Sequence, residues 1–248
     1  MTANRCGGPQ ALAVVVPAHN EEQLLGACLR SIRAALERSD LPSVIVLVAH
    51  RCTDATEAVA RRALAGSEAV VLPDDSASVA TARAAGARAA LARLGPGFAP
   101  EHSWLLSTDA DSTVPGSWVG DLRRHMDRGA AAVAGLVQVH DWEASAVARE
   151  AYRAMIAAGI RRNHHDHVYG ANLAVRLDAF LDVGGWPDEV PGEDAALFER
   201  LRARGWPVTG ATDVLVRTSG RRRPRVAGGL GSLLDRLAAE AVPVLDVG

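Results

Sequence analysis

Short apolar runs that alternate with helical patterns constrain the fold of this chain more than any other feature. The runs are LAVVVP (12–17), VIVLVA (44–49), AVVLP (69–73) and SWLLS (103–107). Apolar residues recur at helical spacing from Leu24 to Leu36, and an alanine-rich helical stretch covers 76–94. Continuous apolar character predicts strands that are buried on both faces. The alternation therefore predicts an α/β fold with a mixed, mostly parallel sheet flanked by helices.

The pattern is less regular after Pro115. We expect further strands at 131–140 and 168–176, and helices at 143–162 and 192–204. No repeat or low-complexity linker interrupts the chain, so one domain over 11–226 is expected. It would follow a flexible N-terminus (1–10) and precede a C-terminal helix or tail (227–248).

Composition narrows the class of protein. The chain is 48% hydrophobic and its net charge is −2, which is typical of a globular protein with a large core. All 27 basic residues are arginine, so mechanisms that need a lysine are excluded. This near-neutral balance lacks the basic footprint of a nucleic-acid-binding domain. The basic residues gather locally only at Arg221, Arg222, Arg223 and Arg225.

The cysteines and the hydropathy of the chain indicate the cellular compartment of the protein. Cys6, Cys28 and Cys52 are widely spaced and odd in number, which predicts reduced thiols and neither a disulfide framework nor a zinc site. The segment MTANRCGGPQ lacks the apolar core of a signal peptide, and no apolar stretch approaches the roughly 20 residues of a membrane span. We expect a soluble, cytoplasmic protein without a transmembrane segment.

Polar loops leave the carboxyl ends of the first four expected strands: PAHNEE, AHRCTD, PDDS and TDADS. In open parallel sheets, ligands bind at this edge. The fourth loop carries Asp109 and Asp111, separated by one alanine. Two carboxylates at this spacing suit a hard divalent cation that also binds phosphate oxygens. The alternative for the pair is a solvated, aspartate-rich turn.

An ordered set of segments resembles the family 2 glycosyltransferases of the GT-A fold, over roughly residues 12–225. The segments are VVVPAHNEE, CTDAT, ATARAAG, STDADS, YGANLAVR, GGW and GEDAALFERLRARGW. The resemblance implies a metal-dependent, inverting enzyme that moves a sugar from a nucleoside-diphosphate sugar to a hydroxyl acceptor. It also implies that Asp109 and Asp111 bind Mn²⁺ or Mg²⁺, that 11–115 is a nucleotide-binding half, and that 116–226 is an acceptor half.

The resemblance further assigns donor contacts. It implies that the donor is bound by Pro17, Asn20, Glu21, His50, Arg83, Asp109 and Ala110. Simpler interpretations are that Pro17 ends a strand, that Glu21 favours a helix N-terminus, and that Arg83 is a solvated helix residue. Many family members place two acids where this chain has Ala49 and His50, so the nucleobase is not identified.

The same resemblance assigns the acceptor side and the chemistry. Asp194 would be the base that takes the proton of the acceptor hydroxyl, and Glu193 would orient the acceptor or the base. The alternative is that both acids only begin a helix. The expected acceptor contacts are Gly170, Ala171, Asn172 and Trp186, although Trp186 could equally be a core residue. The acceptor and the oligomeric state are not indicated.

Further segments bear on the site and on alternative functions. HHDH (164–167) lacks the spacing that converges on zinc, and TSGRRRPR (218–225) matches a region that closes over donor phosphates. Asp109 and Asp111 also fit a haloacid-dehalogenase-type phosphatase, which normally needs a later lysine. A non-catalytic nucleotide-sugar-binding protein is the other alternative. An acidic first loop argues against a nucleotidyltransferase, and the lack of G-x-G-x-x-G argues against a dinucleotide oxidoreductase.

Overall fold

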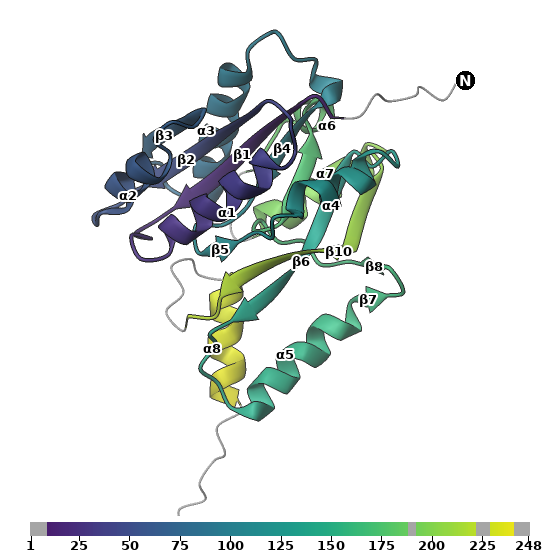
Figure 1. Cartoon of the computed structure of the whole chain (residues 1–248). Helices are drawn as coiled ribbons and strands as arrows, with labels where there is room; N and C mark the ends of the chain where they lie inside the picture. The colour runs from purple at the N-terminus through teal and green to yellow at the C-terminus, as the bar shows by residue number, and fades with distance from the viewer. Residues whose placement is uncertain (1–8, 188–191, 222–228, 241–248) are drawn as a thin grey trace, which may run out of the picture.

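One sheet runs through the molecule. The computed structural model describes residues 9–187, 192–221 and 229–240. Within these residues the sheet has ten strands in the order β3-β2-β1-β4-β9-β6-β10-β8-β7, and β5 pairs with β10 (Figure 1). The strands are β1 (Ala11–Ala18), β2 (Ser43–His50), β3 (Ala69–Asp74), β4 (Ser103–Ser107), β5 (Ser112–Thr113), β6 (Ala132–His140), β7 (Ile160–Arg161), β8 (His164–His165), β9 (Leu173–Arg176) and β10 (Val208–Ser219). The helices are α1 (Leu25–Glu37), α2 (Thr56–Ala63), α3 (Val79–Leu94), the 3₁₀ turn η1 (Pro100–His102), α4 (Trp118–Met126), α5 (Ala146–Ala158), α6 (Leu177–Asp182), α7 (Glu193–Ala203) and α8 (Leu230–Glu240).

The first four predicted strands are present as β1 to β4. β1 pairs in parallel with both β2 and β4, and β2 pairs in parallel with β3. Their carboxyl ends therefore lie at one edge of the sheet. This confirms the predicted α/β class, and it brings the polar loops after the four strands together.

β1 is buried on both faces, as its continuous apolar sequence predicts. Every residue from Ala11 to Ala18 is buried. Because side chains alternate along a strand, Leu12, Val14 and Val16 face one core, whereas Ala13 and Val15 face the other. β1 therefore contributes side chains to two cores, one on each face of the sheet.

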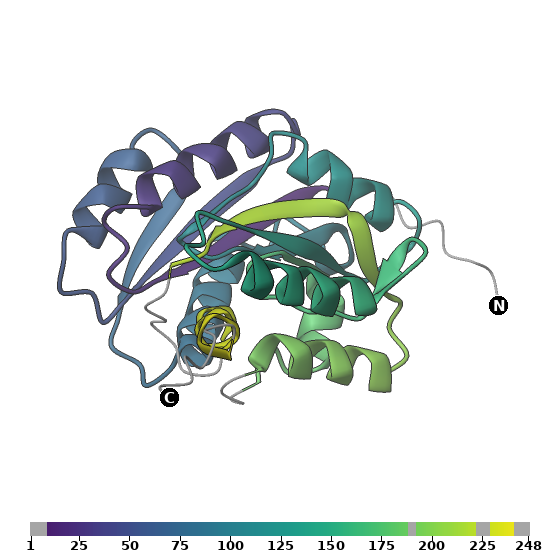
Figure 2. The ribbon, with the colours of Figure 1, turned by 90° about the horizontal axis from the view of Figure 1, so that it is seen from below.

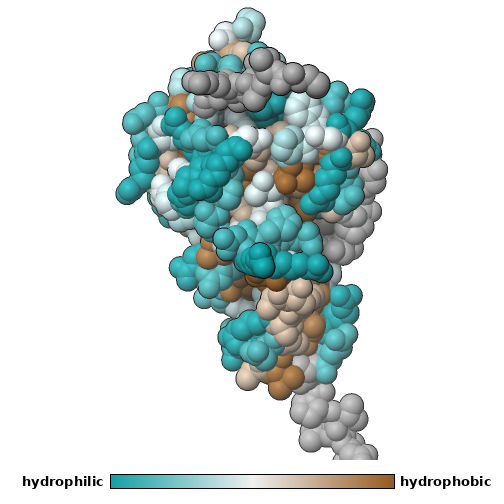
Figure 3. Space-filling model, turned by 90° about the vertical axis from the view of Figure 1, so that its right-hand side faces the viewer, coloured by the Kyte–Doolittle hydropathy of each residue, from teal (hydrophilic) through white to brown (hydrophobic). Residues whose placement is uncertain are grey.

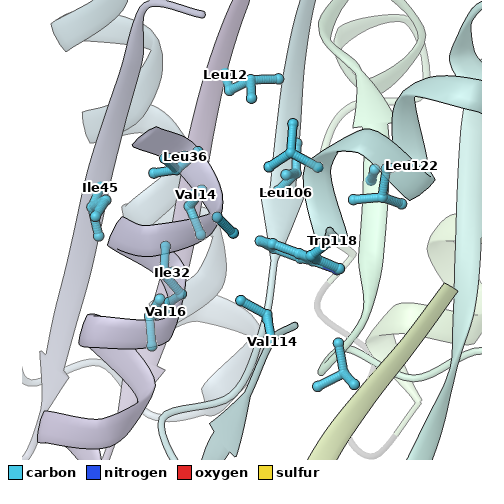
Figure 4. Packing of buried hydrophobic residues seen from close by; sticks show 14 of the residues in the cluster. Leu12, Val14, Val16, Ile32, Leu36, Ile45, Leu106, Val114, Trp118 and Leu122 are labelled. Carbon is cyan, nitrogen blue, oxygen red and sulfur yellow. The ribbon is translucent and has the colours of Figure 1, made fainter. Parts of the chain in front are cut away.

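The two layers are built from different helices (Figure 2). One core packs α1, α2 and α4 against the sheet, with Trp118 of α4 beside Leu106 and Val114 (Figure 4). The other core packs α3, α6 and α7 against the opposite face. Full burial of large side chains such as Trp118 and Phe198 contributes about 1.5–3 kcal/mol each to stability.

α3 begins at Val79, three residues later than expected. Ser78 is extended and forms a capping box with Thr81, so the helix cannot continue toward residue 76. In its middle, a Cβ on Gly86 would lie 2.6 Å from a methyl carbon of Val15 and 2.8 Å from one of Val48. The missing side chain lets α3 lie close against β1 and β2.

In the second half two predicted elements are shorter than expected, and α4, α6 and β10 are present where no element was predicted. The expected strand at 168–176 is shortened to β9, because Asn172 N donates to Tyr169 O in a turn before it. β9 runs antiparallel to both β4 and β6, so the sheet is mixed. The expected helix at 143–162 is shortened to α5, which Ser145 caps and which ends at Gly159.

α5 and α8 form a lobe that projects from the sheet (Figure 1). They pack on each other around Trp142, Ala148, Tyr152 and Leu234. Part of the surface of this lobe is apolar, as the brown and tan atoms in the space-filling view show (Figure 3). In the described ranges, no helix has the length and apolar character needed to cross a bilayer.

Candidate active site

A cavity of about 1330 Å³ lies at the carboxyl edge of β1 to β4. This volume exceeds the roughly 300–1,000 Å³ of most small-molecule pockets, so it has room for two substrates. Eleven of the residues singled out in the sequence line it: Pro17, Glu21, His50, Arg83, Asp109, Ala110, Asp111, Gly170, Ala171, Glu193 and Asp194.

Three of the predicted residues do not line this cavity. Asn20 has a left-handed backbone (φ 54°), and its Oδ1 accepts a 2.7 Å hydrogen bond from Thr53 N, which ties two loops together. Asn172 is fully buried and holds Trp118 through a 3.0 Å hydrogen bond. Trp186 is buried in the core against Phe180, at the T-shaped geometry favoured by aromatic pairs.

Arg83 is the central cation of the site and is only 4% exposed. Its guanidinium donates to Asp109 Oδ1 at 2.6 Å, to Glu193 Oε1 at 3.2 Å and to Ser107 Oγ at 2.8 Å. The interpretation of Arg83 as a solvated helix residue is therefore wrong. Burial of a guanidinium requires such a full set of acceptors.

Gly170 is required by this arrangement. A Cβ at this position would lie 2.6 Å from Nη2 of Arg83, and the Gly170 carbonyl accepts a 3.3 Å hydrogen bond from Nη1. On its other side, Gly170 N donates to Asp194 Oδ2 at 2.7 Å. Gly170 thus links the arginine to the acid at the start of α7.

The acid pair after β4 is held by two different arginines. Asp109 is bound by Arg83, and Asp111 Oδ2 accepts a 2.8 Å hydrogen bond from Arg221. Burial raises the pKa of Asp109 to about 6, while Arg83 opposes that rise and Asp111 adds to it. The pKa of Asp111 is also raised, mainly by burial and against the effect of Arg221.

Arg221 joins the acid pair to the first loop. Its guanidinium binds both carboxylate oxygens of Glu21, one of them at 2.7 Å, in addition to Asp111. The sequence indicated an arginine from TSGRRRPR but not which one. Arg222, Arg223 and Arg225 lie outside the described residues.

Glu193 and Asp194 open α7 but point to different partners. Glu193 is buried and ion-paired with Arg83, and burial raises the pKa of its carboxyl group while Arg83 counteracts this. Asp194 is half-buried and lines the cavity. The residue before them, Gly192, has φ 110°, a conformation that an L side chain rarely adopts.

A histidine pair lies at the other end of the cavity. His50 Nδ1 donates to Asp74 Oδ2 at 2.8 Å, and His19 Nδ1 donates to the His50 carbonyl at 2.8 Å. Burial alone would raise the pKa of Asp74, but hydrogen bonds from Ser76 and His50 lower it below its usual value. PDDS was expected to be a site loop, but only the structure distinguishes Asp74 from its neighbours.

The described residues of this site would supply only part of the coordination shell of a divalent cation. Asp109 and Asp111 offer carboxylate oxygens, the donors that Mg²⁺ and Mn²⁺ prefer. Across the ranges that the structure describes, no group of three or more His, Cys, Asp or Glu side chains is arranged to hold a metal ion. Phosphate oxygens and water would have to complete the coordination, as is usual for Mg²⁺.

The HHDH segment does not converge on a metal. His165 Nε2 donates to the Ala211 carbonyl at 3.2 Å, and His167 Nε2 donates to the Ile156 carbonyl at 2.9 Å. His164 instead pairs with Asp166. The imidazoles are therefore used in separate structural hydrogen bonds.

Comparisons with known families and structures give one matching family and a shared fold. The model of the family described as "Glycosyl transferase family 2" matches residues 13–183. That range includes Asp109, Asp111 and Gly170, and it ends before Asp194 and Arg221. A comparison with curated protein sequences gives no significant match.

Solved structures share the fold at low sequence identity. The mannosyltransferase PcManGT from Pyrobaculum calidifontis, in complex with GDP-Man and Mn²⁺, has a TM-score of 0.67 and 19% identity over 88% of this chain and 59% of its own. S. aureus TarS 1-349 with UDP-GlcNAc has a TM-score of 0.63 and 13% identity over 92% and 65%. GalNAc-T7 with UDP, GalNAc and Mn²⁺ has a TM-score of 0.63 and 15% identity over 86% and 44%. The chain thus spans less than two thirds of the length of each of these proteins.

Proposed function

Because the chain belongs to glycosyl transferase family 2, we propose that it moves one sugar from a nucleoside-diphosphate sugar to a hydroxyl acceptor, with inversion and with a divalent cation. The observation that carries the proposal is the convergence of Asp109, Asp111 and Asp194 with Arg83 and Arg221 on one cavity. The related structures bind GDP-Man or UDP-GlcNAc, which supports a nucleotide-sugar donor.

The nucleoside is proposed to bind at the end of the cavity lined by Pro17, His19 and His50. His50 donates through Nδ1 to Asp74, which leaves Nε2 as the ring's other hydrogen-bonding atom. Ala49 and His50 stand where many family members place two acids, one of which typically recognises uracil. Glu21, which lines the same end, is the proposed ribose contact.

The diphosphate is proposed to lie between Asp111 and Arg221. A guanidinium can bind phosphate oxygens with two parallel hydrogen bonds, so Arg221 can exchange its carboxylate partners for phosphate. Asp109 and Asp111 would hold Mn²⁺ or Mg²⁺, and a bound cation would supply stabilisation of the charge on the departing diphosphate. Mn²⁺ in two of the related structures supports this assignment.

Asp194 is the proposed base. The acceptor oxygen attacks the anomeric carbon as the bond from that carbon to the diphosphate oxygen breaks, and the hydroxyl proton passes to the Asp194 carboxylate. Attack from the face opposite the leaving group inverts the anomeric configuration. Gly170 N donates to Oδ2 at 2.7 Å and Ala195 N donates to Oδ1 at 2.8 Å, so both bonds orient the carboxylate and each oxygen keeps a second lone pair for the acceptor.

The phosphatase alternative fits the geometry less well. It would need Asp109 as a phosphoryl acceptor, and in such phosphatases this aspartate usually follows the first strand, whereas Asp109 follows β4. The absence of lysine from the sequence also opposes it. A non-catalytic nucleotide-sugar-binding protein would bind the nucleotide without turnover, so a turnover assay distinguishes that alternative and a binding assay does not.

Calorimetric titration with UDP, GDP, dTDP and CDP, each with and without Mn²⁺, tests the donor site. We expect one nucleotide to bind at least tenfold more tightly with Mn²⁺, and Asp111→Asn to abolish that gain. Asp121→Asn, which changes a surface acid of α4, is the matched control and should leave the gain intact. If no nucleotide binds under either condition, the proposal is wrong.

A further inference from the structure

The cavity has two walls of different chemistry. The charged wall is formed by the strand ends and the start of α7, and it carries Asp109, Asp111, Asp194 and Arg221. The other wall is mainly apolar and comes from β6, the loop before β9, and the lobe of α5 and α8, which also contributes Arg236 to the lining. We call it the apolar wall, and its residues are Val137, Met155, Val168, Tyr169, Leu230 and Leu233.

The apolar wall begins next to the proposed base. Tyr169 precedes Gly170, whose N–H donates to Asp194 at 2.7 Å. A hydroxyl at Asp194 would therefore carry its substituent toward Tyr169 and the lobe. A nucleotide, a sugar and a diphosphate offer nothing apolar of this extent, so the donor does not account for the wall.

The lobe keeps part of this surface open to solvent. Only Ala148 and Tyr152 of α5 are buried, and they pack in a cluster with Leu234 of α8, Trp142 and Val139 at the end of β6. Met155 remains 37% exposed while it lines the cavity, and Leu230 and Leu233 are half-buried. Exposed apolar surface inside a binding cavity is typically the surface that a bound ligand covers.

We propose, on the basis of the proposed function, that the acceptor is an amphiphile: its hydroxyl lies at Asp194 and an attached alkyl-like apolar group lies along the apolar wall. The apolar group gains affinity by leaving water, and it also directs the hydroxyl toward the base. This names the substrate class of the acceptor half.

A series of alkyl glucosides tests the proposal with the full chain. Methyl, hexyl and octyl β-D-glucoside are titrated below their micelle concentrations, in the presence of the nucleotide and Mn²⁺. Each buried methylene should strengthen binding about fourfold, so octyl, which has two more methylenes, should bind about sixteenfold more tightly than hexyl. Equal affinities across the series would overturn the proposal.

Matched variants on one helix locate the effect. Met155→Gln changes a lining residue of α5, whereas Val147→Gln changes a residue that is 67% exposed on the same helix and does not line the cavity. Met155→Gln should reduce the octyl-to-hexyl affinity ratio below about threefold, and Val147→Gln should leave it near sixteenfold. Leu233→Gln provides a second test from α8. If both α5 variants behave alike, the wall is not the binding surface.

Three further outcomes separate this proposal from its rivals. Nucleotide binding without any dependence on alkyl length would refute the amphiphilic acceptor and leave the donor site intact. Length-dependent binding that Met155→Gln weakens, without any nucleotide binding, would support the apolar wall and refute the glycosyltransferase donor site. Binding of the chain to phosphatidylcholine vesicles that Val147→Gln and Met155→Gln weaken equally would make the lobe a membrane-docking surface instead.

Discussion

At the scale of single residues, the site depends on one buried arginine. Arg83 binds Asp109 on the donor side and Glu193 beside the proposed base. It therefore fixes the distance between the loop after β4 and the start of α7. Lysine could not replace it, because only a planar guanidinium reaches both acids and Ser107 at once. Loss of its charge would leave two acids close together.

Replacement of Arg83 should destabilise the fold. We expect Arg83→Met to lower the free energy of unfolding by about 3 kcal/mol, because it leaves the carboxylate of Glu193 buried without a cation. Arg88→Met changes an exposed arginine of the same helix and should cost about 0.5 kcal/mol or less. Urea denaturation measures both. Equal losses for the two variants would show that the buried pairing is unimportant.

The pair of His50 and Asp74 predicts a dependence of stability on pH. A lowered pKa in the folded state means that the Asp74 carboxylate stabilises the fold above its unfolded pKa near 3.8. The chain should therefore exceed Asp74→Asn in free energy of unfolding at pH 5. That difference should shrink as the pH falls through 3.8. A difference that grows on acidification would contradict the assigned direction.

At the scale of elements, α3 and the sheet determine how closely the donor loops approach one another. Gly86 lets α3 lie against Val15 and Val48, and the same helix carries Arg83 one turn earlier. Helix packing and site geometry are thus coupled through one segment.

Two glycine substitutions test this coupling. Gly86→Ala should destabilise the chain by about 1–3 kcal/mol, because the new Cβ would overlap Val15 and Val48. In α4, a Cβ on Gly120 has no heavy atom within 4 Å, so Gly120→Ala should stabilise the chain by about 0.5–1 kcal/mol through helix propensity. Thermal unfolding of both variants gives the signs, and stabilisation by Gly86→Ala would contradict the close packing.

The order of the first four strands and their site loops could be predicted from sequence, because each apolar run is bounded by a polar turn. The partners of the side chains could not. The sequence gives no sign that Arg83 is buried, since arginines at 88 and 93 share its helix. Asn172 looked like a ligand residue, yet its amide holds Trp118 from another element. Such long-range pairs depend on tertiary packing, which local pattern does not encode.

At the scale of the whole molecule, one cavity joins a charged wall to an apolar one. The sheet edge supplies the acids and arginines, and the lobe of α5 and α8 supplies Met155 and Leu233. Asp194 lies where the walls meet, so the proposed base is within reach of both substrates. The arrangement supports direct transfer between two substrates that are bound together.

Turnover by Asp194→Asn tests the central claim most directly. The measurement is release of nucleoside diphosphate from the nucleotide-sugar whose nucleotide the titration selects, with Asp213→Asn as a surface control. Asparagine retains an oxygen that can accept the hydrogen bond from Gly170 N but cannot take a proton. The account predicts a loss of about 10²–10⁴-fold in turnover with nucleotide affinity within twofold of the parent chain. Turnover equal to that of the parent chain would contradict it.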